Sequence, residues 1–468
     1  MPVHHRRSST GLRLACLRPA SLRPTRSARP GPWACLLGLG LGLGLGLPAA
    51  GAHAEGLLEL YRAANDYDAA YLSARARAES AIYRAAQADA LARPSAAATG
   101  SVNASVIDVP SRGTGDSHTI QGAVNGRYPL FNRANGVTIE QARKSQEIAQ
   151  TELQSAEHDL IVRLSTAYFN VLAGQDALTT TRANKAAITE QLASAKRNFE
   201  VGTATITDTR EAQARFDLAT AQEIFADNDL RTRQIALDQL VGRNGVVPAP
   251  LAVPVELPPI VPASPQDWVA QADSVHPVVR RARLGFDVAR LETAKARAGE
   301  LPTVDAVATL GSSRASGSAA TVGGITTNGG LGLQLNWPLY TGGSTQNRIR
   351  ETLSLEESAR NDLENARRGV AQGAQVAYYG VQSGRAQVQA LEAAESSTQL
   401  ALEATQLGYK VGVRVNLDVL NAQTQLFTTR RDLARARYDV LLNGLKLRQA
   451  AGQLGPDDVA AVDRLLAR

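Results

Sequence analysis

Few residues in this sequence could perform chemistry, and those few are scattered. His118, His158 and His276 lie far apart, both cysteines precede residue 54, and no H-E-x-x-H, G-x-S-x-G or Walker motif occurs. Nucleophilic, metal-binding and phosphate-binding sites need such residues at defined spacings. The sequence therefore predicts a protein that is not an enzyme, with no catalytic residues, no metal site and no cofactor.

Two aspartates occupy equivalent positions in a motif that occurs twice in the chain. Residues 199–216 read FEVGTATITDTREAQARF and residues 409–427 read YKVGVRVNLDVLNAQTQLF, so that Asp208 and Asp418 occupy equivalent positions. Each copy also contains an aromatic residue, a Val-Gly pair and an Ala-Gln pair. Further matches run along the chain at nearly the same offset, which predicts one unit of about 200 residues present twice.

Residues 1–54 have the composition of a secretory signal peptide. They contain seven arginines and no acidic residue, followed by a Gly- and Leu-rich apolar run over 33–47 and by Ala-His-Ala. This order predicts export and cleavage. A retained membrane anchor is the alternative, although the apolar run is short for a membrane span. Most of the excess positive charge lies in this segment, so nucleic acid is not an expected partner.

The longest elements that the sequence predicts are helices. Prolines are absent from 130–247 and from 339–455, and both stretches are rich in Ala, Gln, Glu, Leu and Arg. We expect almost continuous helices over 132–199 and 341–409, each about 100 Å long. Small and polar residues occupy the heptad positions as often as large ones, which favours close helix packing around a wide assembly.

Each long helix is expected to end at one copy of the repeated motif. The tip motifs contain Val201, Gly202, Val411 and Gly412. Glycine at these positions predicts helix ends, and Asp208 followed three residues later by Glu211 predicts a capping box that starts the next helix. Each copy of the motif is therefore expected to form the turn of a helical hairpin.

Ahead of each long helix the sequence changes to Gly, Ser, Thr and Asn with alternating apolar residues. Segments 95–109, 119–131, 303–315 and 330–340 alternate in this way, and each is close to the length of a membrane β-strand. Two soluble β-hairpins are the alternative. Because four strands cannot close a barrel, which needs at least about eight, membrane strands would require the chain to oligomerise.

The ends of these strands carry aromatic residues. The expected membrane-interface aromatics are Tyr128, Phe131, Trp337 and Tyr340. Polar Gly/Ser loops are expected around 111–117 and 316–330.

The expected organisation of the chain has five parts. They are a signal peptide (1–54), a first repeat (55–247) with a strand pair at about 95–131, a Pro-rich linker (248–265), a second repeat (266–454) with a strand pair at about 303–340, and a C-terminal segment (455–468).

Taken together, these residues resemble the TolC family of outer-membrane efflux and type I secretion ducts, including the outer-membrane members of toxin exporters. The likeness covers 55–454 and rests on AYFNVL from residue 167, on the strand exits PLF and PLYTGG, and above all on the two Val-Gly turns. It implies a mixed α and β membrane protein that forms a homotrimer. Four transmembrane β-strands per chain would contribute to a 12-stranded barrel, continued by a long α-helical coiled-coil periplasmic tunnel.

The resemblance also implies residues for an iris gate at the hairpin tips. Thr207 and Asp208 would bond Tyr409 and Arg414 in a latch. Asp418 would line the narrowest pore ring with Asn421, which stands where the family often has a second aspartate.

Plainer roles for these residues stay open from the sequence. Asp208 could only cap a helix, and Tyr409 could only pack on its neighbours. Arg414 could be a solvated surface charge, and Asp418 would be stable near any helix start.

The function expected from the resemblance is a passive exit duct in the bacterial outer membrane, used for type I protein (toxin) secretion. Its implied partners are outer-membrane lipid, a periplasmic adaptor (membrane fusion) protein, and an inner-membrane ABC or proton-driven transporter. The outer-membrane component of a multidrug efflux pump is the alternative. A soluble periplasmic coiled-coil adaptor is an alternative of another class. Because the duct itself does no energy coupling, its partners decide between secretion and efflux.

Overall fold

The computed structural model describes residues 54–109, 113–252, 254–255, 257–318 and 323–467. Contacts divide the chain into Met1–Gly51 and Ala52–Arg468. The expected signal peptide lies outside the described residues except for its last position, and all the helices and strands described belong to the second unit.

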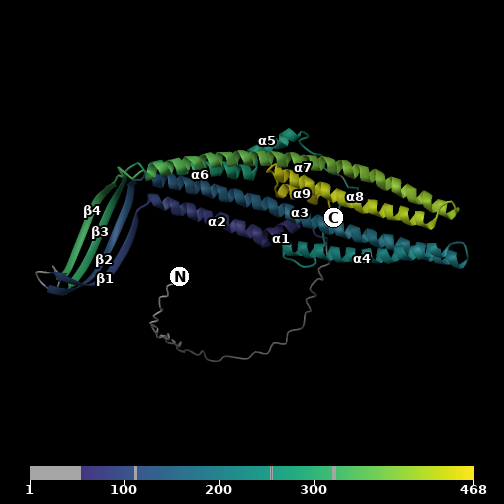
Figure 1. Ribbon diagram of the computed structural model, residues 1–468, viewed down its shortest axis with the longest axis horizontal. Coiled ribbons are helices and arrows are strands. Elements are labelled where there is room, and N and C mark those ends of the chain that lie inside the picture. Colours follow the sequence, from purple (N-terminus) through teal and green to yellow (C-terminus); the bar gives the residue numbers. More distant parts are fainter. Residues whose placement is uncertain (1–53, 110–112, 253, 256, 319–322, 468) are drawn as a thin grey trace, which may run out of the picture. The chain divides into compact units, whose positions relative to one another are not determined.

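Helices make up most of this unit (Figure 1). The helices are α1 (Leu57–Tyr67), α2 (Ala69–Asp89), the 3₁₀ turn η1 (Ala90–Ala92), α3 (Arg133–Glu200), α4 (Ile206–Val241), α5 (Pro265–Val275), α6 (Pro277–Ala298), α7 (Ser344–Lys410), α8 (Asn416–Ala450) and α9 (Pro456–Asp463). With 68 and 67 residues, α3 and α7 are the long helices, and each is about 100 Å in length.

Four strands form one antiparallel sheet in the order β1-β2-β3-β4. The strands are β1 (Ser95–Val109), β2 (Gly113–Phe131), β3 (Thr303–Ser316) and β4 (Gly324–Asn336). Pairing of β2 with β3 joins segments that lie far apart in the sequence, for example Val124 with Leu310. The order helix, two strands, long helix, shorter helix therefore occurs twice along the chain, from α2 to α4 and from α6 to α8.

The strand boundaries differ from those expected at the loops. β2 begins at Gly113 and β4 at Gly324, so the polar loops are shorter than the expected 111–117 and 316–330. β4 ends at Asn336, which places Trp337 and Tyr340 after the strand. Gly has a low intrinsic strand preference, but a neighbouring strand extends the ladder through it.

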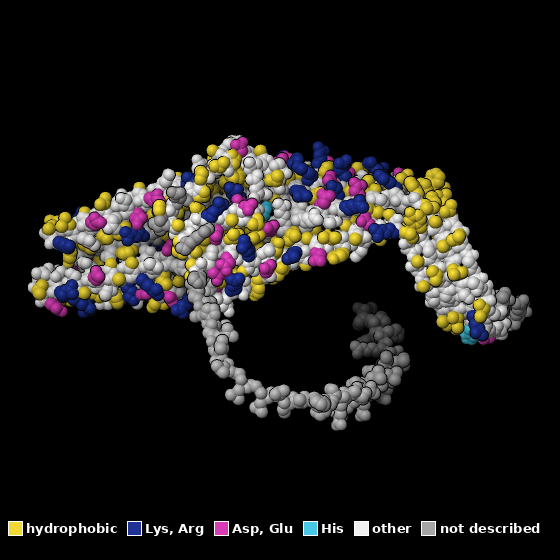
Figure 2. Space-filling model, turned by 180° about the vertical axis from the view of Figure 1, so that it is seen from behind, with side chains coloured by type: hydrophobic (Ala, Val, Ile, Leu, Met, Phe, Trp, Pro, Cys, Tyr) yellow, Lys and Arg dark blue, Asp and Glu magenta, His cyan; other side chains and the backbone are white. Residues whose placement is uncertain are grey.

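One face of the sheet is apolar and exposed. Val102 lies opposite Ile120 in the register, and Leu331 lies opposite Ala308 on the same face. Val102, Ile120, Leu331 and Leu333 are all exposed. Figure 2 shows hydrophobic side chains along the strands, whereas charged side chains are spread over the helices. A sheet face of this kind needs an apolar environment or partner to cover it.

The largest apolar cluster lies where the short helices pack on the hairpins, midway along them. It joins side chains of α1, α3, α4, α8 and α9, including Leu57, Leu164, Leu237 and Leu445. Tyr168 is fully buried there, and its hydroxyl donates a 2.8 Å hydrogen bond to the carbonyl of Ala249 in the linker. The hairpins beyond this region have only small clusters, as expected for closely packed helices with small side chains.

Within the part of the chain that the structure describes, no helix has both the length and the apolar composition needed to cross a membrane.

Candidate functional site

The two copies of the repeated motif form the same turn at the ends of α3 and α7. Gly202 and Gly412 have φ values of 77° and 80°, a left-handed conformation that glycine adopts without strain. The amide of Gly202 donates to the carbonyl of Phe199 at 3.0 Å, and that of Gly412 to the carbonyl of Tyr409 at 3.1 Å. The amide one residue further on bonds Asn198 in the first turn and Gly408 in the second. Both tips are therefore Schellman motifs, which need glycine where the Val-Gly pair supplies it.

The helix after the first turn is capped by Thr205 rather than by Asp208. The Thr205 hydroxyl accepts a 3.1 Å bond from the amide of Asp208, and the Asp208 carboxylate accepts a 3.0 Å bond from the amide of Thr205. This is a reciprocal capping box, in which Asp208 occupies the third helical position. The expected box of Asp208 with Glu211 is thus wrong by three residues, because α4 begins earlier, at Ile206.

The second turn has no such cap. Val415 precedes α8 and provides no side-chain oxygen for its first amides. Arg414 instead folds against the preceding helix, where a methyl group on Gly408 would come within 2.8 Å of Arg414 Cγ. Its guanidinium forms a 3.6 Å ion pair with Asp418 in the first turn of α8. The negative charge of Asp418 is favourable at that helix start.

Three side-chain contacts join the first hairpin to the second near the tips. Asn198 Nδ2 donates to the hydroxyl of Tyr409 at 3.3 Å, and Arg215 Nη2 donates to Asn421 Oδ1 at 3.0 Å. Gln191 donates to Asn416. Leu420 of α8 also enters the small apolar cluster formed by α3 and α4. Near the tips, the two hairpins of one chain are therefore held together by hydrogen bonds in which at most one partner is charged, and by a thin apolar layer.

The expected latch residues lie at the tips, but they do not bond one another within one chain. Among the described residues, the Asp208 carboxylate is bonded only to Thr205, while Tyr409 is bonded by Asn198 and Arg414 pairs with Asp418. Thr207 is exposed. The expected ring residues Asp418 and Asn421 lie one turn apart on α8.

Sequence reasoning missed four residues of this region. Thr205-x-x-Asp208 is a recognisable capping signature that overlaps the one chosen. No sequence signal identifies Asn198, Gln191 or Arg215, because their importance depends on which side of each helix meets the other hairpin.

The expected membrane-interface aromatics gather at the helix end of the sheet. Tyr128 lies opposite Ala306 and Phe131 opposite Val304, close to where β3 begins. All four aromatic side chains, including Trp337 and Tyr340 beyond β4, are exposed. On the opposite sheet face, Arg127 forms a 2.6 Å ion pair with Asp305, which is almost completely buried.

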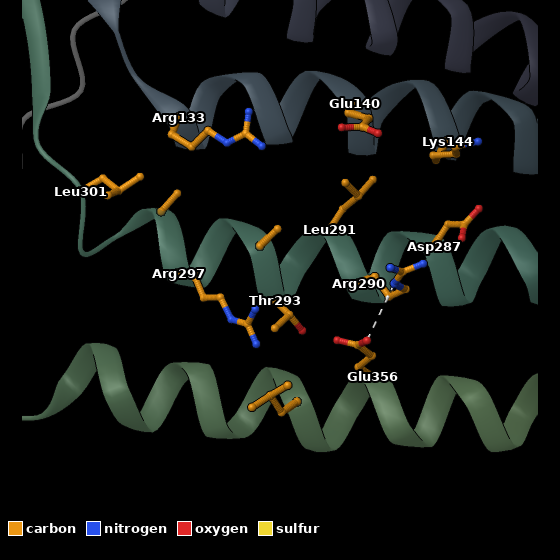
Figure 3. Close-up of a pocket in the computed structure, with 13 residues that line it drawn as sticks. Arg133, Glu140, Lys144, Asp287, Arg290, Leu291, Thr293, Arg297, Leu301 and Glu356 are labelled. Atoms are coloured by element: carbon orange, nitrogen blue, oxygen red, sulfur yellow. Dashed lines mark ion pairs between the residues drawn. The ribbon is translucent and has the colours of Figure 1, made fainter.

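A cleft of about 750 Å³ lies between α3, α6 and α7 just below the strands (Figure 3). Arg133 and Arg297 lie toward the strand end, and Arg290 forms a 3.9 Å ion pair with Glu356 further along. Acidic residues Glu140 and Asp287 also line the cleft. The cleft is lined by both basic and acidic side chains, so its charge does not favour binding of either anions or cations. Over the described residues, no group of three or more His, Cys, Asp or Glu side chains could hold a metal ion.

Comparisons with known proteins agree on one family. The family model described as outer membrane efflux protein matches residues 60–243 and again residues 268–453. The outer membrane protein TolC of Vibrio cholerae is 32% identical over 412 residues, covering 88% of this chain and 93% of that protein. The alkaline protease secretion protein AprF of Pseudomonas aeruginosa is 34% identical over 317 residues, covering 67% of this chain and 66% of that protein.

A solved structure shows the same fold. The outer membrane protein VceC of Vibrio cholerae matches with a TM-score of 0.70 at 20% identity, covering 85% of this chain and 96% of that one.

Proposed function

Because the chain belongs to the outer membrane efflux protein family, to which TolC belongs, we propose that three copies of it form the exit duct of a tripartite export system. The protein is located in the bacterial outer membrane and is a transport protein rather than an enzyme. This location is incompatible with the alternative of a soluble periplasmic adaptor. The trimer, the gate and the exported cargo are the parts that we propose.

The four-stranded sheet is the observation that carries the proposal. Among the described strands, β1 and β4 each pair on one side only, and unpaired edges inside a membrane are costly. Three copies would supply twelve strands, so that each β1 could pair with β4 of a neighbouring copy and leave no edge. The exposed apolar face would then contact lipid, and the face with Arg127 and Asp305 would line the lumen.

The aromatic residues fit this placement. Tyr128, Phe131, Trp337 and Tyr340 would lie at the periplasmic boundary of the membrane, where aromatic side chains are favoured. The helices α3 and α7 would extend from there about 100 Å into the periplasm as a coiled-coil tunnel, with the hairpin tips at its far end. The twofold repeat of the chain would place two hairpins from each copy around that tunnel.

At the tips, Asp208 of one copy would accept hydrogen bonds from Tyr409 or Arg414 of the iris latch. Arg414 is mostly exposed and held only by a 3.6 Å ion pair, so it can reach a neighbouring copy without losing a strong contact. Asp418 and Asn421 would line the narrowest ring. A periplasmic adaptor that binds the tips would open the latch by competing for these bonds.

We favour protein secretion over drug efflux as the cargo class. The support is the relative named for alkaline protease secretion, which is 34% identical. An inner-membrane ABC transporter is then the expected energy source, whereas a proton-driven transporter would fit the efflux alternative. The experiment that distinguishes secretion from efflux is to cross-link the protein to its neighbours in cells, isolate the complex and identify the inner-membrane transporter that it contains.

The assembly is tested by native mass measurement in mild detergent. A stable trimer supports the proposed duct. A stable monomer or dimer that remains in the outer membrane would contradict it, because four or eight strands from such copies would not give the twelve-stranded barrel.

A further inference from the structure

The contact between Arg215 and Asn421 bears on the charge of the proposed pore ring. Arg215 lies on α4 of the first hairpin, and its Nη2 is 3.0 Å from Asn421 Oδ1 on α8 of the second. Asn421 cannot neutralise the guanidinium, because an amide carries no charge. Arg215 of the first hairpin thus places a positive charge beside Asn421, the proposed ring residue of the second hairpin.

The single acid of the ring is already paired with a second guanidinium. Asp418 forms its 3.6 Å ion pair with Arg414. The nearby Asp217, on the same helix as Arg215, accepts a 3.0 Å hydrogen bond from Gln213. Each chain therefore places one ion pair at the ring positions, Arg414 with Asp418, together with the additional positive charge of Arg215 beside the neutral Asn421. Arginine remains charged at any pH that a folded protein survives, so this excess is permanent.

We propose that Arg215 determines the ion selectivity of the closed duct: its positive charge beside the neutral Asn421 opposes the carboxylate of Asp418, so that small inorganic anions pass at least as readily as cations. The inference rests on the proposed function, which places Asp418 and Asn421 at the narrowest point. Three copies would place three Arg215 guanidinium groups around a narrow opening, where charges act more strongly than in bulk water.

The reversal potential of single channels in a planar bilayer, measured under a KCl gradient, tests this proposal. Arg215→Gln removes one positive charge per chain and should raise the permeability ratio of K⁺ to Cl⁻ by about sevenfold or more. A unit charge roughly 7 Å away in water changes the local concentrations of K⁺ and Cl⁻ by about 2.7-fold each, in opposite directions. Arg210→Gln is the matched control, because it makes the same substitution at an exposed position of α4, five residues earlier. It should leave the ratio unchanged.

Two variants of Asn421 separate the effect of the Arg215 charge from the effect of its hydrogen bond between the hairpins. Asn421→Ala removes the hydrogen bond but keeps the Arg215 charge, so it should leave the permeability ratio close to that of the unmodified duct. Asn421→Asp adds a carboxylate and should shift the ratio toward K⁺, in the same direction as Arg215→Gln. If Arg215→Gln conducts but leaves the ratio unchanged, or if Asn421→Ala shifts it equally, the electrostatic role is wrong. Trimers that form no channel at all would contradict the proposed duct itself.

Discussion

Asp208 can serve both as a helix cap and as part of a gate. The hydrogen bonds from Thr205 reach only one of its carboxylate oxygens, Oδ2, at 3.0 Å from the amide and 2.7 Å from the hydroxyl. An ionised carboxylate has about four acceptor positions, so Oδ1 remains available to a donor from a neighbouring copy. The cap would also hold the carboxylate in one orientation before any neighbour binds it, which lowers the entropic cost of the latch.

We predict that Thr205→Ala destabilises the first tip. Loss of the hydroxyl removes the bond to the Asp208 amide, and loss of an N-cap typically costs about 0.5–2 kcal/mol. Hydrogen exchange of the amides at the start of α4 should become faster, while those of α8 should not change. Thr207→Ala is the matched control, because Thr207 is exposed in the same turn. Equal acceleration in both variants would show that the capping box adds nothing to the tip.

The helix ends at the tips were predictable from the sequence, whereas the start of α4 was not. Gly202 and Gly412 identify the ends because few other residues tolerate their positive φ. Thr205-x-x-Asp208 and Asp208-x-x-Glu211 are both capping signatures, and they overlap. The length of the Schellman turn decides between them, since the chain is free to resume the helix at Ile206.

At the scale of elements, alternation in the sequence predicts the strand faces better than the strand ends. Leu331 and Leu333 share one face of the sheet as expected, because side chains alternate strictly along a strand. The beginning of β4 at Gly324 depends on its partner, β3, which continues to Ser316 and offers backbone groups to pair with. A single segment does not contain that information.

We predict that Leu333→Arg impairs assembly into the membrane. In the proposed barrel Leu333 contacts lipid, and an arginine there costs roughly 2–4 kcal/mol near the middle of the bilayer. Gln334→Arg is the matched control, because Gln334 lies opposite Asp305 on the other face, where an arginine can be paired or hydrated. The readout is the amount of each variant recovered as trimer from the outer membrane. Similar losses for both would reject the assignment of faces.

Two histidines lie in the region midway along the hairpins. His158 of α3 is buried and His276, the N-cap of α6, is half-buried, and burial lowers the pKa of each ring below its ordinary value. The charges of Glu157, Asp159 and Asp458 act in the opposite direction on His158, but burial dominates. His158 also lowers the pKa of His276 further.

The sign of the pH effect follows from these shifts. A histidine whose pKa is lower in the folded state binds fewer protons there than in the unfolded state, so its stabilising contribution is present above its ordinary pKa and is lost as the pH falls. We predict that the melting temperature falls between about pH 7.5 and pH 5.5, and that His158→Gln reduces this fall. His118→Gln, at an exposed position of the sheet, is the control. An unchanged pH dependence in His158→Gln would contradict the prediction.

At the scale of the whole molecule, the sequence indicates an assembly but not the contacts within it. In the proposed duct, the long proline-free helices and the strands with one apolar face would be completed by other copies, and both features are evident from composition and alternation. The contacts between hairpins depend on how two helices are rotated relative to each other. For that reason Asn198 and Arg215 could be assigned only once the helices were placed.

The gate is the feature for which the two copies of the motif differ in a useful way. The first copy supplies an acceptor, Asp208, while the second supplies two donors, Tyr409 and Arg414. Because the donors and the acceptor lie on different hairpins, a bond between them in the proposed gate would hold hairpins together, and its loss would let them separate. Within one chain these residues have other partners, so the latch would form only between copies.

We therefore predict that Tyr409→Phe combined with Arg414→Ser raises single-channel conductance in planar bilayers. Each charge-assisted bond contributes about 1.5–3 kcal/mol, and three copies would lose it together. Arg210→Gln controls for the loss of an exposed arginine near the tips. If the double variant forms intact trimers whose conductance is unchanged, Tyr409 and Arg414 only pack the tip, and the closed state must depend on the contacts that Asn198 and Arg215 make.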